Sequence, residues 1–200
     1  MHATQHPLNR AQLRKSIRQK RCSLNEFEQQ QHAQNLTKNI CNLSAFRNAR
    51  RIAFYLPEDG EIDTAYLIEH AWRDNKQVYL PVLAPFNGAL YFAPYYPASK
   101  LIPNRFGINE PTCHPRLWLR ARQLNLILLP LVAFDTQGNR LGMGGGFYDR
   151  SLAFTRYHKQ RHSPQLIGLA HDLQKIEQLP CESWDIPLNM IATEKTIYQF

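Results

Sequence analysis

The sequence has no run approaching the roughly 20 apolar residues that a membrane-spanning helix needs. Its N-terminal stretch, MHATQHPLNR, also has no apolar segment of the kind found in secretory signals. We therefore expect a cytoplasmic protein without membrane contact. Its cysteines, Cys22, Cys41, Cys113 and Cys181, include no CxxC pair. This spacing fits neither a zinc site nor a disulfide framework, so we interpret all four as reduced thiols.

Acidic side chains are absent from the first 25 residues, so most of the formal net charge of +8 lies in one segment. Six basic residues precede Glu26: Arg10, Arg14, Lys15, Arg18, Lys20 and Arg21. The pattern predicts a helix over about residues 8–21, with Leu13 and Ile17 on one face and a stripe of Arg10, Arg14 and Arg18 on another. Like charges at this spacing repel, and an anionic partner would relieve the repulsion. A solvated basic face is an equal alternative, and a nucleic-acid surface is a weaker one because no aromatic residues interleave with the basic ones.

Beyond the basic helix, short apolar runs alternate with helical patterns. Ser23 and Glu26 have capping-box spacing and predict a second helix that ends near Ile40. We expect strands at 51–56, 77–83, 124–134, 165–171 and 190–200, a strand or hairpin arm at 89–96, and helices from near 63, at 114–122 and at 147–162. A proline-rich ordered loop is expected from 94 to 115.

This order of elements predicts the fold class. The strand–helix–strand order predicts parallel pairing, and the run LNLILLPLVAF predicts a central strand buried on both faces. A chain of 200 residues with 44% hydrophobic content can bury one core. We predict one catalytic domain over 1–200, a three-layer α/β/α fold with a mostly parallel, Rossmann-like sheet.

The stretch RLGMGGGFYDR, from Arg140 to Arg150, lacks the features of the two familiar glycine-rich loops. It has no Lys-Ser or Lys-Thr pair after its last glycine, as a Walker loop requires, and phenylalanine replaces the third glycine of GxGxxG. Its glycines still allow close approach of the backbone to phosphate at a helix start, and Asp149 could hold a magnesium ion bridging to that phosphate. The alternative is a glycine-rich turn in which Asp149 balances the helix dipole.

The segment LPLVAFDTQGNRLGMGGGFYDR resembles PGxAFDxxGxRLGxGxGYYDR, the signature of the 5-formyltetrahydrofolate cyclo-ligases, also called methenyltetrahydrofolate synthetases. The segments LRKSIRQKR, FYLPEDGEIDTAYLIEHAWRDNKQVYLPV, FGINEP and LPCESWDIPLNMIATE follow in the family's order, so the resemblance covers nearly the whole chain. It implies ATP- and magnesium-dependent cyclisation of 5-formyltetrahydrofolate to 5,10-methenyltetrahydrofolate in one-carbon folate metabolism. In that reaction the formyl oxygen is phosphorylated, and ADP and phosphate are released.

The resemblance also implies roles for individual residues. ATP contacts are implied at Arg10, Ala11, Gln12, Leu13, Arg14, Arg140, Leu141, Gly142, Met143, Gly144, Gly145, Gly146, Phe147 and Tyr148. We add Arg18 because it continues the arginine stripe. Folate contacts are implied at Leu56, Glu61, Met143, Gly144, Gly145, Gly146 and Phe147, magnesium ligands at Asp149 and Asp185, and catalytic roles for Arg140, Tyr148 and Asp149. From the residues alone, Glu61 could instead be an acidic helix cap and Asp185 a turn aspartate. We expect a monomer that binds 5-formyltetrahydrofolate and ATP but neither nucleic acid nor membrane.

The sequence departs from the family pattern at four positions. Leu131 stands where glycine is frequent, Met143 replaces an aromatic residue or arginine, Gly145 replaces a lysine found in part of the family, and Phe147 replaces a tyrosine. His158 and His162 have the spacing of paired metal ligands but lack an HExxH glutamate, so we interpret them as an exposed polar face. The competing hypothesis is an anion- or RNA-binding module in which the basic helix is the active surface.

Overall fold

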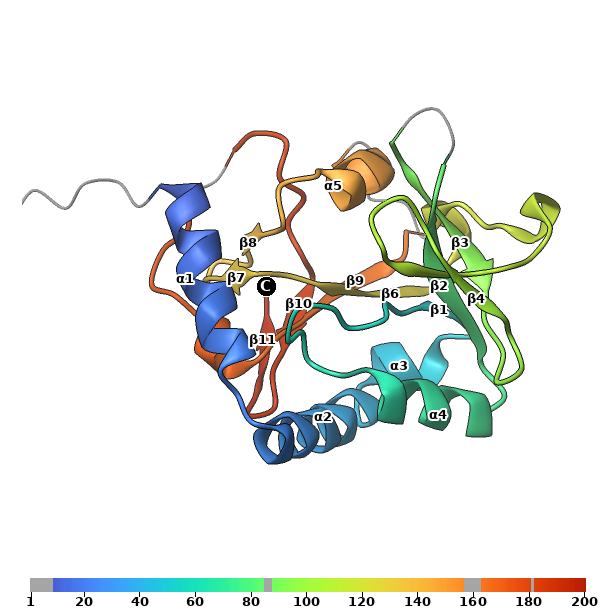
Figure 1. Cartoon of the computed structure of the whole chain (residues 1–200), viewed down its shortest axis with the longest axis horizontal. Coiled ribbons are helices and arrows are strands. Elements are labelled where there is room, and N and C mark those ends of the chain that lie inside the picture. The colour runs from blue at the N-terminus through green and yellow to red at the C-terminus, as the bar shows by residue number, and fades with distance from the viewer. Residues whose placement is uncertain (1–8, 85–87, 157–162, 181) are drawn as a thin grey trace, which may run out of the picture.

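The computed structural model describes residues 9–84, 88–156, 163–180 and 182–200 (Figure 1). Its α-helices are α1 (Arg10–Cys22), α2 (Glu26–Cys41), α3 (Ser44–Asn48), α4 (Ala65–Arg73) and α5 (Phe147–Leu152). Its strands are β1 (Arg51–Ala53), β2 (Gln77–Leu83), β3 (Leu90–Pro94), β4 (Leu101–Pro103), β5 (Asn109–Pro111), β6 (Leu126–Pro130), β7 (Ala133–Phe134), β8 (Arg140–Leu141), β9 (Gln165–Leu169), β10 (Met190–Ala192) and β11 (Ile197–Gln199).

A mostly parallel sheet organises the described residues. Seven strands lie in the order β11-β10-β9-β6-β1-β2-β3, and the five inner strands are parallel to one another. The predicted parallel pairing of the first two strands is confirmed, with Arg51 opposite Gln77. The edge strands β3 and β11 run antiparallel to their neighbours, so the 89–96 segment is a hairpin arm on β2.

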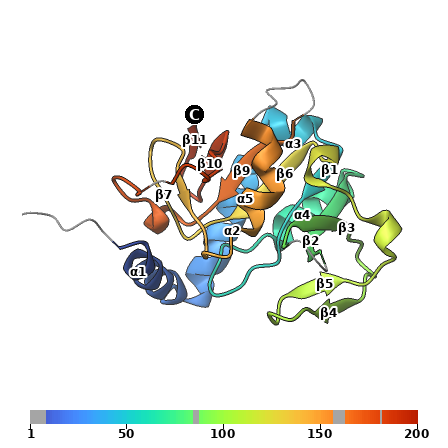
Figure 2. The ribbon, with the colours of Figure 1, turned by 90° about the horizontal axis from the view of Figure 1, so that it is seen from above.

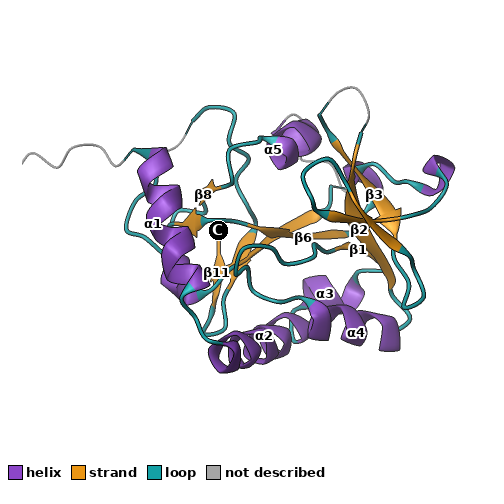
Figure 3. Ribbon diagram, viewed as in Figure 1, coloured by secondary structure: helices purple, strands orange, loops and turns teal. Residues whose placement is uncertain are grey.

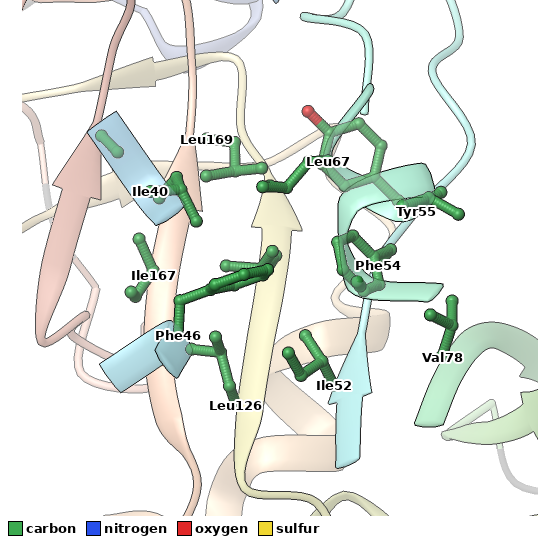
Figure 4. Packing of buried hydrophobic residues seen from close by; sticks show 14 of the residues in the cluster. Ile40, Phe46, Ile52, Phe54, Tyr55, Leu67, Val78, Leu126, Ile167 and Leu169 are labelled. Atoms are coloured by element: carbon green, nitrogen blue, oxygen red, sulfur yellow. The ribbon is translucent and has the colours of Figure 1, made fainter. Parts of the chain in front are cut away.

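Helices cover both faces of this sheet, which confirms the predicted α/β architecture. Helices α2, α3 and α4 lie along one face and α5 lies on the other (Figures 1 and 3). The residues of β6 alternate between two hydrophobic cores: Leu126 and Leu128 belong to the core under α2–α4, and Ile127 and Leu129 to the opposite core. Figure 4 shows Leu126 among Phe46, Ile52 and Ile167 in the first of these cores. The central run is therefore buried on both faces, as predicted.

The capping box before α2 uses different residues from those predicted. The Asn25 side chain accepts the backbone N–H of Glu28, and the Glu28 carboxylate accepts that of Asn25. Ser23 is instead the C-cap of α1, and its hydroxyl donates to the carbonyl of Lys20. Asn25 and Glu28 repeat the same three-residue spacing two positions later, where the chain is free to begin a new helix.

Several predicted elements are shorter or divided. The run 124–134 forms β6 and then β7, which pairs with β8 outside the main sheet, while 190–200 forms an antiparallel pair of strands. The 114–122 segment forms two 3-10 turns rather than a helix, at Pro115–Leu117 and Ala121–Gln123. Helix α5 ends at Leu152 and continues as a 3-10 turn to Arg156. The rest of the predicted helix, including His158 and His162, lies outside the described residues.

Leu131, one of the four departures, has a packing role. A Cβ atom placed on Gly168 of β9 would lie 2.6 Å from the Cδ2 atom of Leu131. Leu131 therefore fills the space that the glycine leaves beside the sheet. Among the described cysteines, Cys22, Cys41 and Cys113 are free, and no helix in the same residues is long and apolar enough to cross a bilayer.

Candidate active site

A cavity of about 560 Å³ opens beyond the carboxyl ends of β1, β2 and β6. Ligands bind at this edge in open parallel α/β sheets, and cavities of about 300–1,000 Å³ hold small molecules. Helix α1 and the β4–β5 arm lie on opposite sides of this end of the molecule (Figure 2). Both contribute to the lining, which combines apolar side chains with arginines and carboxylates.

The predicted glycine loop forms one wall of the cavity. Gly144 and Gly146 have φ values of +102° and +63°, which other residues rarely adopt, and Gly146 is the N-cap of α5. No side chain caps this helix start. The loop therefore presents backbone rather than side chains to much of the cavity.

Two departures from the family pattern are structurally linked. A Cβ atom on Gly145 would lie 2.7 Å from the Phe147 ring, closer than real contacts allow. The same ring contacts Phe106 of the β4–β5 arm edge to face, with 5.8 Å between centroids, and lies 5.1 Å from the Arg150 guanidinium carbon. Because Phe147 occupies the space above Gly145, a lysine at position 145 requires this ring to move.

The arginine stripe of α1 contacts groups within the chain. Arg10 forms two hydrogen bonds with the Asp185 carboxylate at 3.0 and 3.3 Å, and the Nε atom of Arg14 donates to the carbonyl of Gly142 at 2.8 Å. The Arg18 guanidinium binds the Asp59 carboxylate. Acidic and carbonyl groups of this chain thus compensate the repulsion along the stripe. Arg10 and Arg14 line the cavity, whereas the face with Leu13 and Ile17 is buried as predicted.

The predicted magnesium ligands lie together at the same end of the cavity. The backbone N–H of Ile186, next to Asp185, donates to the Asp149 carboxylate at 3.2 Å. Asp149 also binds the Arg140 guanidinium at 2.6 Å. Burial lowers the pKa of Arg140, and the nearby carboxylates of Asp149 and Asp185 oppose that shift. Magnesium is commonly held by one or two carboxylates together with substrate phosphates, so this donor set fits the ion.

Glu61, a predicted folate contact, is largely buried at the cavity wall, with a side chain 10% exposed. Burial raises its pKa to about 7, although the charge of Arg21 acts in the opposite direction. Arg21 is fully buried, and its guanidinium lies 3.7 Å from Glu61 and 3.5 Å from Asp59. Arg21 follows Ile17 by four residues, so it continues the buried face of α1 that Leu13 and Ile17 begin.

Tyr148 is partly buried at the cavity and packs beside the hydrophobic core on the α5 side. Burial first, and then the nearby charge of Glu61, raise its pKa above the ordinary value. Its phenol therefore keeps its proton at neutral pH and can donate a hydrogen bond into the cavity. Tyr55, on the β1 side, has its pKa raised for the same two reasons.

Most of the predicted site residues line this one cavity. They are Arg10, Arg14, Leu56, Glu61, Arg140, Gly142, Met143, Gly144, Gly145, Gly146, Phe147, Tyr148, Asp149 and Asp185. Five predicted residues lie elsewhere. Leu13 and Leu141 pack in a small buried cluster, Ala11 and Gln12 are exposed, and Arg18 binds Asp59. Their assignment to ATP binding remains a prediction.

The structure adds lining residues to which the sequence analysis assigned no site role. Phe106 and Ile108, at the tip of the β4–β5 arm, and Trp184, beside Asp185, are exposed apolar side chains at the cavity. The FGINEP segment was noted in the sequence but received no role. Exposed aromatic residues in a proline-rich loop could have drawn attention to it, because such side chains often mark binding surfaces.

The fold and the site together define an α/β protein with a cavity of small-molecule size, lined by arginines, carboxylates and apolar side chains. The model of the 5-formyltetrahydrofolate cyclo-ligase family matches residues 8–194. The chain is 44% identical to the 5-formyltetrahydrofolate cyclo-ligase of Escherichia coli and 46% identical to that of Haemophilus influenzae. These alignments cover 92% and 90% of this chain, and 100% and 94% of the relatives.

Solved structures agree with these sequence relatives. The 5,10-methenyltetrahydrofolate synthetase of Aquifex aeolicus superposes with a TM-score of 0.80 at 31% identity, covering 95% of this chain and 92% of that one. The Mycoplasma pneumoniae synthetase gives a TM-score of 0.71 at 25% identity, with coverage of 94% and 99%. The chain belongs to the 5-formyltetrahydrofolate cyclo-ligase family and is an enzyme.

Proposed function

We propose that this protein catalyses the ATP- and magnesium-dependent cyclisation of 5-formyltetrahydrofolate to 5,10-methenyltetrahydrofolate, with release of ADP and phosphate. One observation carries the proposal: a single cavity brings the arginines of α1, the glycine loop and the paired aspartates together with Leu56 and Glu61. The arginines, the glycine loop and the aspartates suit a triphosphate. Leu56 and Glu61 suit a pterin beside apolar surface.

The chemistry requires the formyl oxygen to become a leaving group. That oxygen attacks the γ-phosphorus of ATP, the bond to ADP breaks, and the formyl oxygen carries the phosphoryl group. N10 of the folate then attacks the formyl carbon and loses its proton, and departure of phosphate leaves the methenyl bridge. Such a reaction depends on positioning and charge stabilisation more than on a covalent nucleophile.

The triphosphate end of the cavity is built from α1 and the glycine loop. The Arg14 guanidinium lies across Gly144, with its central carbon 3.6 Å from where a Cβ atom would be, and hydrogen-bonds Gly142. Arg10 lies in the same wall. Guanidinium groups bind phosphate oxygens in a fixed geometry, and backbone N–H groups of a glycine loop can approach them closely.

Asp149 and Asp185 would hold the magnesium ion. Bound there, the ion would supply positive charge that offsets the charge of the triphosphate. In the structure each of these carboxylates binds an arginine, Arg140 or Arg10. The same guanidinium groups can turn to phosphate oxygens when a cation takes their carboxylates, since both are anionic acceptors.

Glu61 would recognise the folate. An ionised carboxylate can accept paired hydrogen bonds from the amino group and ring N–H of a pterin. Glu61 is restricted by its buried position and by the backbone N–H of Glu58, which donates to it at 3.3 Å. This restriction favours a fixed orientation of the pterin ring at the end of β1.

The proposal is tested by mixing the protein with 5-formyltetrahydrofolate, ATP and magnesium and recording the near-ultraviolet absorbance of the methenyl product. Product should appear only with all components present, and ADP should form in equal amount. Product without ATP would contradict the proposed phosphorylation, and no product under any of these conditions would overturn the function. Replacement of ATP by a non-hydrolysable analogue is the matched control.

A further inference from the structure

A second cluster of ligand-type side chains lies away from the cavity lining. His32 from α2, His171 after β9 and Glu194 between β10 and β11 converge from three elements far apart in the sequence. One ring nitrogen of each histidine and one carboxylate oxygen of Glu194 all lie within 4.8 Å of one another. None of the three is used by the proposed reaction.

The two histidines are in direct contact through their Nδ1 atoms, which are 2.8 Å apart. The Nε2 atom of His171 lies 3.2 Å from the carbonyl oxygen of Gly60, which can only accept a hydrogen bond. His171 must therefore carry its proton on Nε2 and direct the Nδ1 lone pair at His32. Metal-binding histidines commonly show this arrangement, because a carbonyl that accepts one ring N–H orients the other nitrogen toward the metal.

Burial of the cluster also favours a metal ligand set. His171 is fully buried and the Glu194 side chain is 6% exposed, so neither is a solvated surface group. The other Glu194 oxygen, Oε2, accepts the backbone N–H of Asp172 at 2.9 Å, which fixes the carboxylate. His32 is 22% exposed and provides a route for an ion and a water ligand.

We propose that His32, His171 and Glu194 form a binding site for a borderline divalent metal ion such as zinc. Two imidazoles and one carboxylate suit zinc, whereas magnesium and calcium prefer oxygen ligands. Nitrogens bound to one tetrahedral zinc ion lie about 3.3 Å apart, since each Zn–N bond is about 2.0–2.1 Å. Binding therefore requires the two Nδ1 atoms to separate by about half an ångström and the widest pair of ligand atoms to close from as much as 4.8 Å. The Nδ1 proton of His32 shifts to Nε2 of the same ring.

The site would join three parts of the fold to the wall of the cavity. The metal would fix α2 to the loop after β9 and to the β10–β11 turn, and His171 passes this restraint to Gly60, the neighbour of Glu61. Gly60 has a φ of +72°, and a Cβ atom there would lie 3.1 Å from the carbonyl oxygen of Arg21. The segment next to Glu61 is thus tightly packed. Because zinc would join three parts of the fold, it should raise the melting temperature of the protein.

The experiment is a calorimetric titration of the untagged full chain with zinc chloride in excess magnesium. We expect one zinc ion per chain. His32→Gln and Glu194→Gln should each weaken binding by at least about tenfold, the lower end of what loss of a supporting contact costs. His70→Gln, which changes a half-exposed histidine on α4, should leave binding unchanged.

Zinc-edge X-ray absorption of the wild-type protein tests the ligand set without any substitution. It should show two imidazole ligands per zinc ion. Absence of zinc binding, binding that His32→Gln leaves unchanged, or a spectrum without two imidazoles would each overturn the proposed site. Circular dichroism of each variant separates loss of a ligand from loss of the fold.

Discussion

Glu61 should lower the stability of the protein at high pH, and the substitution Glu61→Gln should remove this dependence on pH. Its pKa rises from 4.5 to about 7 because the carboxylate is buried. The folded chain then binds this proton more tightly than the unfolded chain, so the ionised carboxylate destabilises the fold above pH 7. The destabilisation disappears as the pH falls from 7 towards 4.5. At about 1.4 kcal/mol per pH unit, it amounts to about 3 kcal/mol at high pH.

The test compares wild type with Glu61→Gln by urea unfolding at a series of pH values from 5 to 8. The difference in unfolding free energy between the two proteins should change by about 2–3 kcal/mol over this range, in favour of the variant at high pH. The attraction of Arg21 for the ionised carboxylate already contributes to the Glu61 pKa, so the pH slope is the diagnostic quantity. Glu177→Gln, at an exposed glutamate, controls for the removal of one carboxylate. If the unfolding free energies of wild type and Glu61→Gln changed with pH in parallel, the reasoning would be refuted.

Other predictions concern the cavity. Folate affinity, measured by fluorescence titration, should fall about tenfold from pH 8 to pH 6, because the proposed pterin contact requires Glu61 in its ionised form. Asp149→Asn should lower kcat by about 100-fold or more in the absorbance assay, whereas a simple anion-binding module would tolerate it. Arg14→Ala should weaken ATP binding by about 10–100-fold and folate binding much less; equal losses would mean that α1 is misassigned. Gly144→Ala should cost about 1–3 kcal/mol in urea unfolding because φ is +102°, whereas Gly142→Ala, with open space around it, should cost less.

The elements predicted well from the sequence are those whose signal is local. The parallel strands and the buried face of α1 follow from hydrophobic spacing over a few residues, and the glycine loop follows from its composition. The N-cap of α2 was misplaced by two residues, because two motifs of equal spacing overlap and Ser23 already ends α1. Local rules cannot choose between such motifs without knowing where the preceding helix stops.

The charge pairs could not be predicted, because their members are far apart in the sequence. Arg18 and Asp59 are separated by 41 positions, and Arg10 and Asp185 by 175. Arg21 was counted only as one of six basic residues in the segment, yet it is fully buried and meets Asp59 and Glu61 in the fold. The sequence therefore identified most of the residues that share the cavity but not which of them neutralise one another.

The partners of α1 have an order along the chain that bears on how the protein is synthesised. From the C-terminal end of the helix to its N-terminal end, Arg21 contacts residues 59 and 131, Arg14 contacts residue 142, and Arg10 contacts residue 185. A 13-residue helix with a stripe of like charge is marginal alone, so α1 must wait for these partners. At about 5–20 residues per second, the wait between Arg10 and Asp185 lasts about 10–35 s. The helix should thus close onto the growing domain from its C-terminal end, and its contact between Arg10 and Asp185 should be the last of these helix contacts to form.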